Sequence, residues 1–312
     1  MGDILGGVVF SRPPGRSPPR IAPDGPPRGV LDTNPSMNAR PRTSHDDLIR
    51  RAQNALDDEH FEEAEALGRR ALMLQGESLD ARQVIASAII EQGGYDEAAV
   101  LLEEILAAEP EDLASLADLG LCLFEMCRFD RAEAVLAHAL AVDSSDPQAC
   151  YWMALCVERH GASDYAAAEE LFQRAHHADP EAYPLPTRFS AEEFQEIVHE
   201  SIDELPDEAR VFVRNGTLSI HVPDLPRADE LYAFDPPADP CLFGLYVGTP
   251  LPERSLGQTP QLPDVICIYK RNLERMFHDR DDLVEEIKIT VLHEIGHYFG
   301  LDEDELAERG LA

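Results

Sequence analysis

The chain has 312 residues, 44% of them hydrophobic, which is enough for two ordinary domains with their own cores. Its 60 acidic side chains against 26 lysines and arginines give a formal net charge of −34. Nucleic acid and anionic membranes repel such a surface, so neither is an expected partner, and a charged partner should be basic. No apolar run approaches the 18 residues of a membrane-spanning helix, so we expect no part of the chain to span a membrane.

Cysteine usage predicts the compartment. The six cysteines are scattered, and none forms a C-x-x-C pair. Four of them fall at apolar positions of predicted helices, which favours buried, reduced thiols and therefore a reducing cytoplasm. The six positions are Cys122, Cys127, Cys150, Cys156, Cys241 and Cys267.

Residues 1–44 form the first segment of distinct composition. They are rich in proline, glycine and arginine, with few apolar residues after Val9. A segment of this composition cannot build a core, so we expect a disordered arm. The short apolar run Ile4–Phe10 has no basic region before it and an Arg-Pro pair after it, so it does not fit a secretory signal.

Residues 45–180 contain a repeat. An aromatic residue recurs at spacings of 34, 34 and 36, with alanine three residues later and a small or aliphatic residue ten residues later. The aromatic positions are Phe61, Tyr95, Phe129 and Tyr165; the alanines are Ala64, Ala98, Ala132 and Ala168; the third set is Ala71, Ile105, Ala139 and Ala175. The longer last spacing predicts a turn insertion around residues 160–164.

This periodic pattern resembles the tetratricopeptide repeat. The resemblance implies an all-α solenoid of helix pairs, in which each pair buries its apolar face against the next. It also implies a surface that docks a peptide or a protein partner and performs no chemistry itself.

A proline-rich stretch, 181–189, predicts a linker to a second domain at 190–312. Ser190 and Glu193 form a capping-box pattern that opens a helix ending near Pro206. We then expect a hairpin over residues 210–222, a proline-rich loop to residue 239, and strands over 242–247 and 264–269. The hairpin turn would be Asn215-Gly216. The long connection 248–263 is of the kind that flanks active sites.

A long helix is predicted after Asp281 or Asp282, either of which can act as the N-cap. Glu285 and Glu286 would then lie in its first turn, where the helix dipole favours acidic groups. Its buried stripe should consist of Leu283, Ile287, Val291, Ile295 and Tyr298. Gly300 should end the helix in the left-handed conformation.

Near the end of this helix lies the run His293-Glu294-Ile295-Gly296-His297, an H-E-x-x-H pattern. Residues four apart share one helix face, so the two histidines can hold one metal ion, and zinc is the metal that this pattern favours. Glu294 lies about 100° round the helix and suits a general base acting on water. Thr290 and the histidines lie beside the apolar stripe, so they need not be core residues.

A third ligand is expected just after the glycine turn, because zinc accepts a carboxylate oxygen. Glu303 completes an H-E-x-x-H-x-x-G-x-x-E pattern, while Asp302 and Asp304 remain alternatives. Metzincins carry histidine at the last position of this pattern, so the acidic residue excludes them. A last short helix is expected over residues 304–309.

Residues 188–310 resemble the small bacterial zincin-like metallopeptidases, also called minimal zincins. The resemblance lies in four stretches: residues 194–206 (FQEIVHESIDELP), 242–250 (LFGLYVGTP), 262–270 (LPDVICIYK) and 282–306 (DLVEEIKITVLHEIGHYFGLDEDEL). It implies a compact α+β fold, bound zinc and peptide-bond hydrolysis. It also implies that His293, His297 and Glu303 are ligands and that Glu294 is the base. Zincins bind substrate as an added strand at a sheet edge, for which Leu245-Tyr246-Val247 is the candidate.

The sequence thus predicts a multidomain protein, with an all-α tetratricopeptide-like solenoid before a small α+β zincin-like domain. We expect a zinc metallopeptidase whose array docks a substrate or a protein partner. The alternative is an interaction scaffold whose zincin-like domain holds zinc but hydrolyses nothing. Tyr269 and Tyr298 are expected in the core rather than at an oxyanion. The remaining histidines of the second domain, His199, His221 and His278, are expected at the surface.

Overall fold

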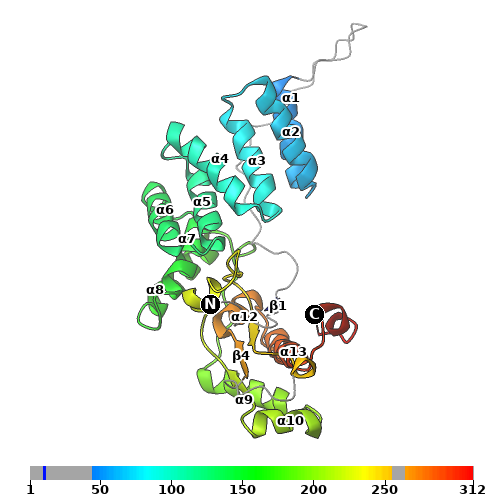
Figure 1. Cartoon of the computed structure of the whole chain (residues 1–312). Coiled ribbons are helices and arrows are strands. Elements are labelled where there is room, and N and C mark those ends of the chain that lie inside the picture. Colours follow the sequence, from blue (N-terminus) through cyan, green and yellow to red (C-terminus); the bar gives the residue numbers. More distant parts are fainter. Residues whose placement is uncertain (1–9, 12–43, 255–263, 312) are drawn as a thin grey trace. The chain divides into compact units, whose positions relative to one another are not determined.

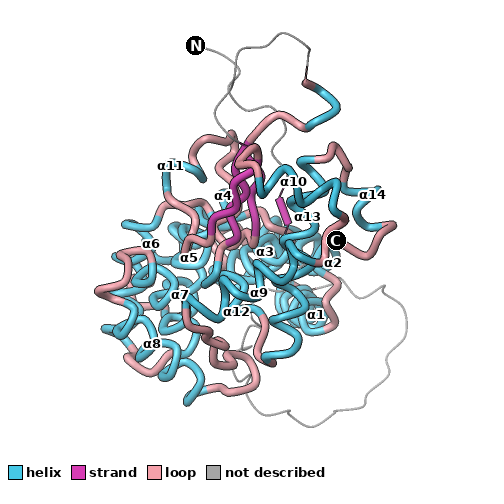
Figure 2. Tube along the Cα trace, turned by 90° about the horizontal axis from the view of Figure 1, so that it is seen from below, coloured by secondary structure: helices cyan, strands magenta, loops and turns pink. Residues whose placement is uncertain are grey.

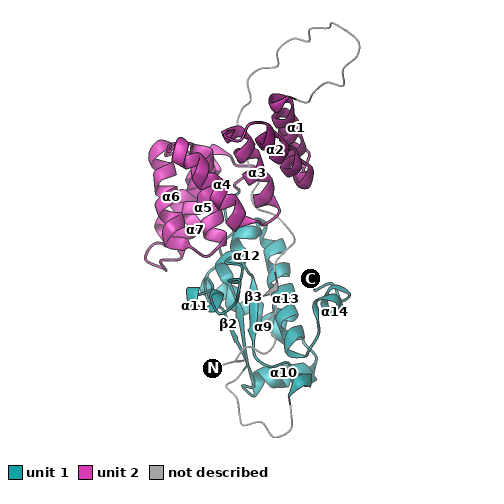
Figure 3. Cartoon of the chain, turned by 45° about the horizontal axis from the view of Figure 1, so that its top comes forward, with its two compact units in different colours: residues 1–16, 184–312 teal, residues 17–183 magenta. Residues whose placement is uncertain are grey.

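The computed structural model describes residues 10–11, 44–254 and 264–311. The chain divides into two compact units, which Figure 3 colours separately. One unit comprises Ser17–Tyr183, and the other comprises Met1–Arg16 together with Pro184–Ala312. The division falls between Tyr183 and Pro184. Figure 1 labels the elements in chain order, and Figure 2 separates helices from strands.

The described part of the first unit is an array of paired helices, as the repeat predicts. Each helix contacts the next one along the chain. The pairs are α1 (His45–Asp57) with α2 (Phe61–Leu74), α3 (Leu79–Glu91) with α4 (Tyr95–Ala108), α5 (Leu113–Glu125) with α6 (Phe129–Val142), and α7 (Pro147–Glu158) with α8 (Tyr165–Ala178). The turn between α7 and α8 carries the predicted insertion. The all-α repeat class is therefore confirmed.

The repeat follows from two features of each unit. The first helix of every pair is capped by a side chain that accepts a hydrogen bond from the third residue beyond it, at Ser44, Ser78, Asp112 and Asp146. Each second helix begins at the repeating aromatic residue, and the alanine three residues later is fully buried. A methyl side chain lets neighbouring helices approach closely, which explains why that position is always alanine.

The second unit is an α+β domain, as predicted. Its helices are α9 (Ala191–Asp203), α10 (Asp207–Arg214), α11 (Ala228–Leu231), α12 (Lys270–Met276), α13 (Arg280–Tyr298) and α14 (Glu303–Ala307). Its strands are β1 (Phe10–Ser11), β2 (Leu218–His221), β3 (Gly244–Val247) and β4 (Asp264–Ile268).

The four described strands form one sheet in the order β1-β3-β4-β2. β2 pairs parallel with β4, in the register Leu218 to Asp264. β3 runs antiparallel to β4 on one side and to β1 on the other. Among the described residues, the outer side of β3 pairs with the two residues of β1.

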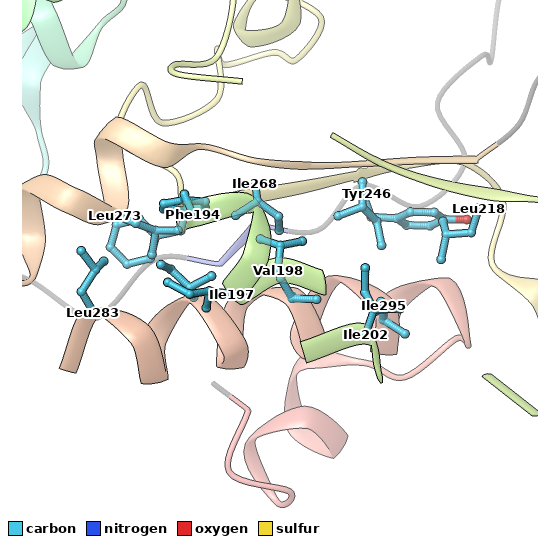
Figure 4. Close-up of a cluster of buried hydrophobic side chains, with 14 of the residues drawn as sticks. Phe194, Ile197, Val198, Ile202, Leu218, Tyr246, Ile268, Leu273, Leu283 and Ile295 are labelled. Carbon is cyan, nitrogen blue, oxygen red and sulfur yellow. The ribbon is translucent and has the colours of Figure 1, made fainter. Parts of the chain in front are cut away.

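The core of this domain lies between the sheet and two helices. α13 packs against α9 and contacts β3, β4 and β1. Figure 4 shows the apolar side chains of α9, α13 and the strands meeting in one buried cluster. All five residues of the predicted stripe on α13 are buried in it: Leu283, Ile287, Val291, Ile295 and Tyr298. This packing fixes the orientation of α13 about its own axis.

The predicted hairpin over residues 210–222 is wrong. Residues Asp207–Arg214 form helix α10, and only Leu218–His221 is a strand, paired with β4. Asp207 and Glu208 in the first turn and Arg214 in the last suit the helix dipole. Gly216, at a φ of 76°, makes the turn after the helix rather than a hairpin turn.

The predicted disordered arm differs from the structure at two residues. Phe10–Ser11 forms strand β1, because the open side of β3 offers backbone partners to an extended segment. The rest of that arm, residues 1–9 and 12–43, lies outside the described residues, as does 255–263 of the long connection. Within the described ranges, no helix has the length and apolar character required to cross a membrane.

Candidate metal centre

Helix α13 carries the histidine pair and begins earlier than predicted. Its N-cap is Asp279, whose side chain accepts from the backbone N–H groups of Asp281 and Asp282. The cap precedes the predicted position because those two aspartates lie inside the first turn, where their charges favour the helix dipole.

The helix ends as predicted at Gly300, whose φ is 86°. The N–H of Gly300 donates to the carbonyl of His297, and that of Leu301 to the carbonyl of Gly296. These two bonds form a Schellman turn. The turn sends the chain back along α13 and places the following acidic residues near the histidines.

Both histidines are buried, with side-chain exposures of 3% for His293 and 2% for His297. The sequence predicted that they lie beside the core, and in the structure backbone carbonyls from the segments that follow the helix contact both rings. Nδ1 of His293 lies 2.6 Å from the carbonyl oxygen of Leu311, and Nδ1 of His297 lies 3.0 Å from that of Leu301. A carbonyl oxygen can only accept, so each Nδ1 carries a proton, and the neutral form of such a ring has its lone pair on Nε2.

The Nε2 atoms face each other at 2.8 Å. The two carboxylate oxygens of Glu303 lie 3.7 Å away, Oε2 from Nε2 of His293 and Oε1 from Nε2 of His297. Ligand atoms of the three residues all lie within 4.8 Å of one another. Four acceptor atoms that converge in this way repel one another unless a cation lies between them.

The donor set fits zinc. Zinc–ligand lengths near 2.0–2.1 Å and tetrahedral angles separate two ligand atoms by about 3.3 Å. The observed 2.8 and 3.7 Å lie on either side of that value. Burial lowers the pKa of His297 to about 4, and the neighbouring His293 adds to this shift. The ring is therefore neutral near pH 7, the form that binds a metal.

Glu303 is the acidic residue that the structure brings to the histidines. Asp302 is the N-cap of α14 and accepts from the backbone N–H of Glu305, while the Glu305 side chain accepts from the backbone N–H of Asp302. This capping box holds Asp302 and Glu305 at the backbone. α14 covers Glu303–Ala307, so it begins one residue before the predicted start at residue 304 and ends two residues before the predicted end at 309.

The close packing of α14 on α13 depends on Gly296, within the motif. A Cβ at this position would lie 2.5 Å from Cδ2 of Leu306, which is fully buried. The missing side chain allows α14 to approach the histidine-bearing turn. At the end of α14, Gly310 has a φ of 72°, and the N–H of Leu311 donates to the carbonyl of Leu306. This turn delivers the Leu311 carbonyl to His293.

Glu294 lies on the sheet side of α13 and is fully buried. Its carboxylate lies against Gly244 of β3, where any Cβ would overlap it. Glycine at that position lets the strand pass directly beside the carboxylate. The predicted base and the predicted edge strand are thus neighbours.

The remaining predicted residues lie away from this centre. Tyr269 is buried and donates to Glu230 at 3.2 Å, and the ring of Tyr298 packs in the core against Phe212. Both tyrosines are core residues, as expected. His199, His221 and His278 are exposed, also as expected.

Sequence reasoning missed the two backbone carbonyls that orient the histidines. Every residue has a carbonyl, so the residue type does not mark the ones that contact the histidines. The only signal in the sequence is the pair of glycines, Gly300 and Gly310, that make the turns just before Leu301 and Leu311.

Paired helices with this repeat, followed by an α+β domain with an H-E-x-x-H helix, define a repeat protein joined to a zincin-like domain. Residues 216–311 match the family model described as zincin-like metallopeptidase, and residues 89–154 match the one described as tetratricopeptide repeat. The chain thus combines a zincin-like metallopeptidase domain with tetratricopeptide repeats. None of the curated proteins matches it.

Solved structures resemble part of the chain. One is YrrB, described as a tetratricopeptide-repeat protein with an unusual peptide-binding site, at 22% identity over 45% of this chain and 71% of that one, with a TM-score of 0.38. A thermophilic tetratricopeptide-repeat protein of Thermus thermophilus matches at 20% identity over 46% and 77%, with a TM-score of 0.39. The protein MamA matches at 16% identity over 45% and 81%, with a TM-score of 0.40.

Deletion of Gly310–Ala312 tests the role of the Leu311 carbonyl. Without this acceptor the His293 ring is no longer held in the Nδ1–H form, so zinc affinity should fall by roughly 10- to 100-fold. Affinity is measured by competition with a chromogenic chelator. The matched control is Leu311→Ala, which keeps the carbonyl and should bind zinc like the parent chain. Equal affinity of the deleted and parent chains would contradict this role.

Proposed function

We propose that this protein is a zinc-dependent metallopeptidase whose repeat array docks a protein substrate or partner. The observation that carries the proposal is the convergence of His293, His297 and Glu303, with Nε2 lone pairs and carboxylate oxygens facing one point. Three protein donors in a zinc site with four positions are typical of catalysis, whereas structural sites use four.

The roles of the residues follow from their placement. Zinc, when bound, supplies Lewis acidity toward a carbonyl oxygen and lowers the pKa of water. His293, His297 and Glu303 bind the metal, and the carbonyls of Leu301 and Leu311 hold the two rings in the ligating tautomer. Glu294, next to the histidine pair and buried against β3, takes a proton from the attacking water and delivers it to the leaving amine.

A library of short peptides tests this function on the zinc-loaded full chain. Hydrolysis that a chelator abolishes and added zinc restores is the expected result. Bound zinc without hydrolysis of any peptide would instead support the non-catalytic scaffold. The cytoplasm is the proposed compartment, since the six cysteines, all within the described residues, form no disulfide.

The proposed division of labour is tested by expressing residues 184–312 alone. This start keeps Thr187–Phe189, which binds α12: the N–H of Thr187 donates to the Glu274 carbonyl and that of Phe189 to the Glu274 carboxylate. We expect a folded domain with about one zinc per chain. It should keep the kcat of the full chain on short peptides and cleave a protein substrate poorly. An unfolded or metal-free product would contradict the proposed domain division.

A further inference from the structure

The outer side of β3 binds a segment from the opposite end of the sequence. Phe10 pairs with Leu245 and Ser11 with Gly244, antiparallel. More than 230 residues separate these partners along the chain, so the local sequence does not impose the contact. β1 also contacts α13, the helix that carries the histidines.

This pairing lies beside the proposed catalytic base. Ser11 is opposite Gly244, and the Glu294 carboxylate occupies the place that a Cβ of Gly244 would need. A strand added to this side of β3 therefore runs past Glu294. Backbone pairing at a sheet edge is a general way of binding an extended peptide, because N–H and C=O groups form the contacts regardless of side-chain sequence.

The chemistry of the N-terminal segment suits this edge. Ile4–Phe10 is apolar and includes Val8 and Val9, which favour strands. Pro13 and Pro14 follow, and proline has no backbone N–H to donate to a sheet.

Charge supports the same occupant. Residues 1–16 carry two arginines and one aspartate, whereas residues 184–312 carry 27 acidic and 11 basic side chains. A basic segment is attracted to an acidic domain, and the attraction weakens as salt rises.

We propose that strand Phe10–Ser11 is an intramolecular occupant of the outer edge of β3, the edge at which the zincin resemblance implies that an extended peptide adds as a strand. The segment competes with peptides for the edge and so restrains the enzyme. The restraint on hydrolysis rests on the proposed peptidase function, whereas the competition for binding does not.

The size of the effect follows from tethering. An attached segment whose effective concentration is roughly 1 mM competes as the free segment would at that concentration. If the free segment binds with a Kd of about 0.1 mM, it weakens the apparent affinity for a competing peptide by roughly tenfold. Removal of the segment should therefore lower KM by about this factor and leave kcat unchanged.

Binding is tested first, without chemistry. Zinc-loaded chains carrying Glu294→Gln, with and without residues 1–16, are titrated into a fluorescent peptide of residues 3–16. We expect binding by the deleted chain and about tenfold weaker binding by the intact one. A second variant, the intact chain with both Phe10→Pro and Ser11→Pro, should bind the peptide like the deleted chain. The same two prolines in the free peptide should abolish its binding.

Hydrolysis is measured next, with Glu294 restored. Zinc content and circular dichroism establish that the deleted chain is folded. Lower KM in the deleted chain, with competitive inhibition by the free segment peptide, is the expected result. Equal peptide binding by all the chains would overturn the inference even if hydrolysis is found. If the chain without residues 1–16 binds the peptide more tightly than the intact chain but neither chain hydrolyses any peptide, the inference is supported and the peptidase function is rejected.

Discussion

Glu294→Gln should retain about one zinc per chain and lose peptide hydrolysis. Glutamine keeps the shape of the side chain beside Gly244 but cannot take a proton from water. Removal of a general base lowers rates by roughly 10²- to 10⁴-fold, so kcat/KM should fall by that factor. The measurement is initial rates on the best peptide of the library, together with elemental analysis of the same samples.

The matched control is Glu285→Gln. Glu285 is an exposed glutamate on the same helix, so the change in charge is identical and α13 keeps its packing. Its rate should equal that of the parent chain. Equal rates for Glu294→Gln and the parent chain would remove Glu294 from the mechanism, whatever the zinc content.

The double variant His293→Ala/His297→Ala should bind no zinc. The two imidazoles supply both nitrogen donors of the centre, and a single carboxylate from Glu303 cannot hold the ion tightly. Bound zinc should drop from about one per chain to none, and hydrolysis should disappear with it. Elemental analysis after dialysis against a weak chelator gives the stoichiometry.

His199→Ala/His221→Ala is the matched control, because it removes two exposed histidines of the same domain. It should retain zinc. Full zinc content in the His293/His297 variant would place the metal elsewhere. Thermal unfolding adds a second readout, because a ligand that binds only the folded state stabilises it. The parent chain should lose this stabilisation on chelation, and the His293/His297 variant should show no change.

The local pattern of the sequence determined several elements of this protein. The 34-residue repeat predicted the array, because each helix pair must bury the same face against its neighbour. The 3.6-residue period predicted the buried side of α13, and the H-E-x-x-H spacing placed two histidines on one helix face. These features depend on residues close together in the chain or on regular repetition, so a single sequence reveals them.

One local pattern was ambiguous. Asn215-Gly216 after an apolar segment fits both a hairpin turn and the glycine turn that ends a helix. The parallel pairing of β2 with β4 and the charges at the ends of α10 decided in favour of the helix. Short apolar segments carry too little periodicity to separate the two alternatives.

The tertiary structure alone decided which groups meet at the centre. The capping box holds Asp302 at the backbone, so Glu303 faces the histidines. Carbonyls of Leu301 and Leu311 set the tautomers, although nothing in a sequence marks a backbone oxygen for such a role. The partner of the β3 edge comes from residues 10–11, which precede it by more than 230 residues. Such contacts depend on the packing of distant segments, which local pattern does not encode.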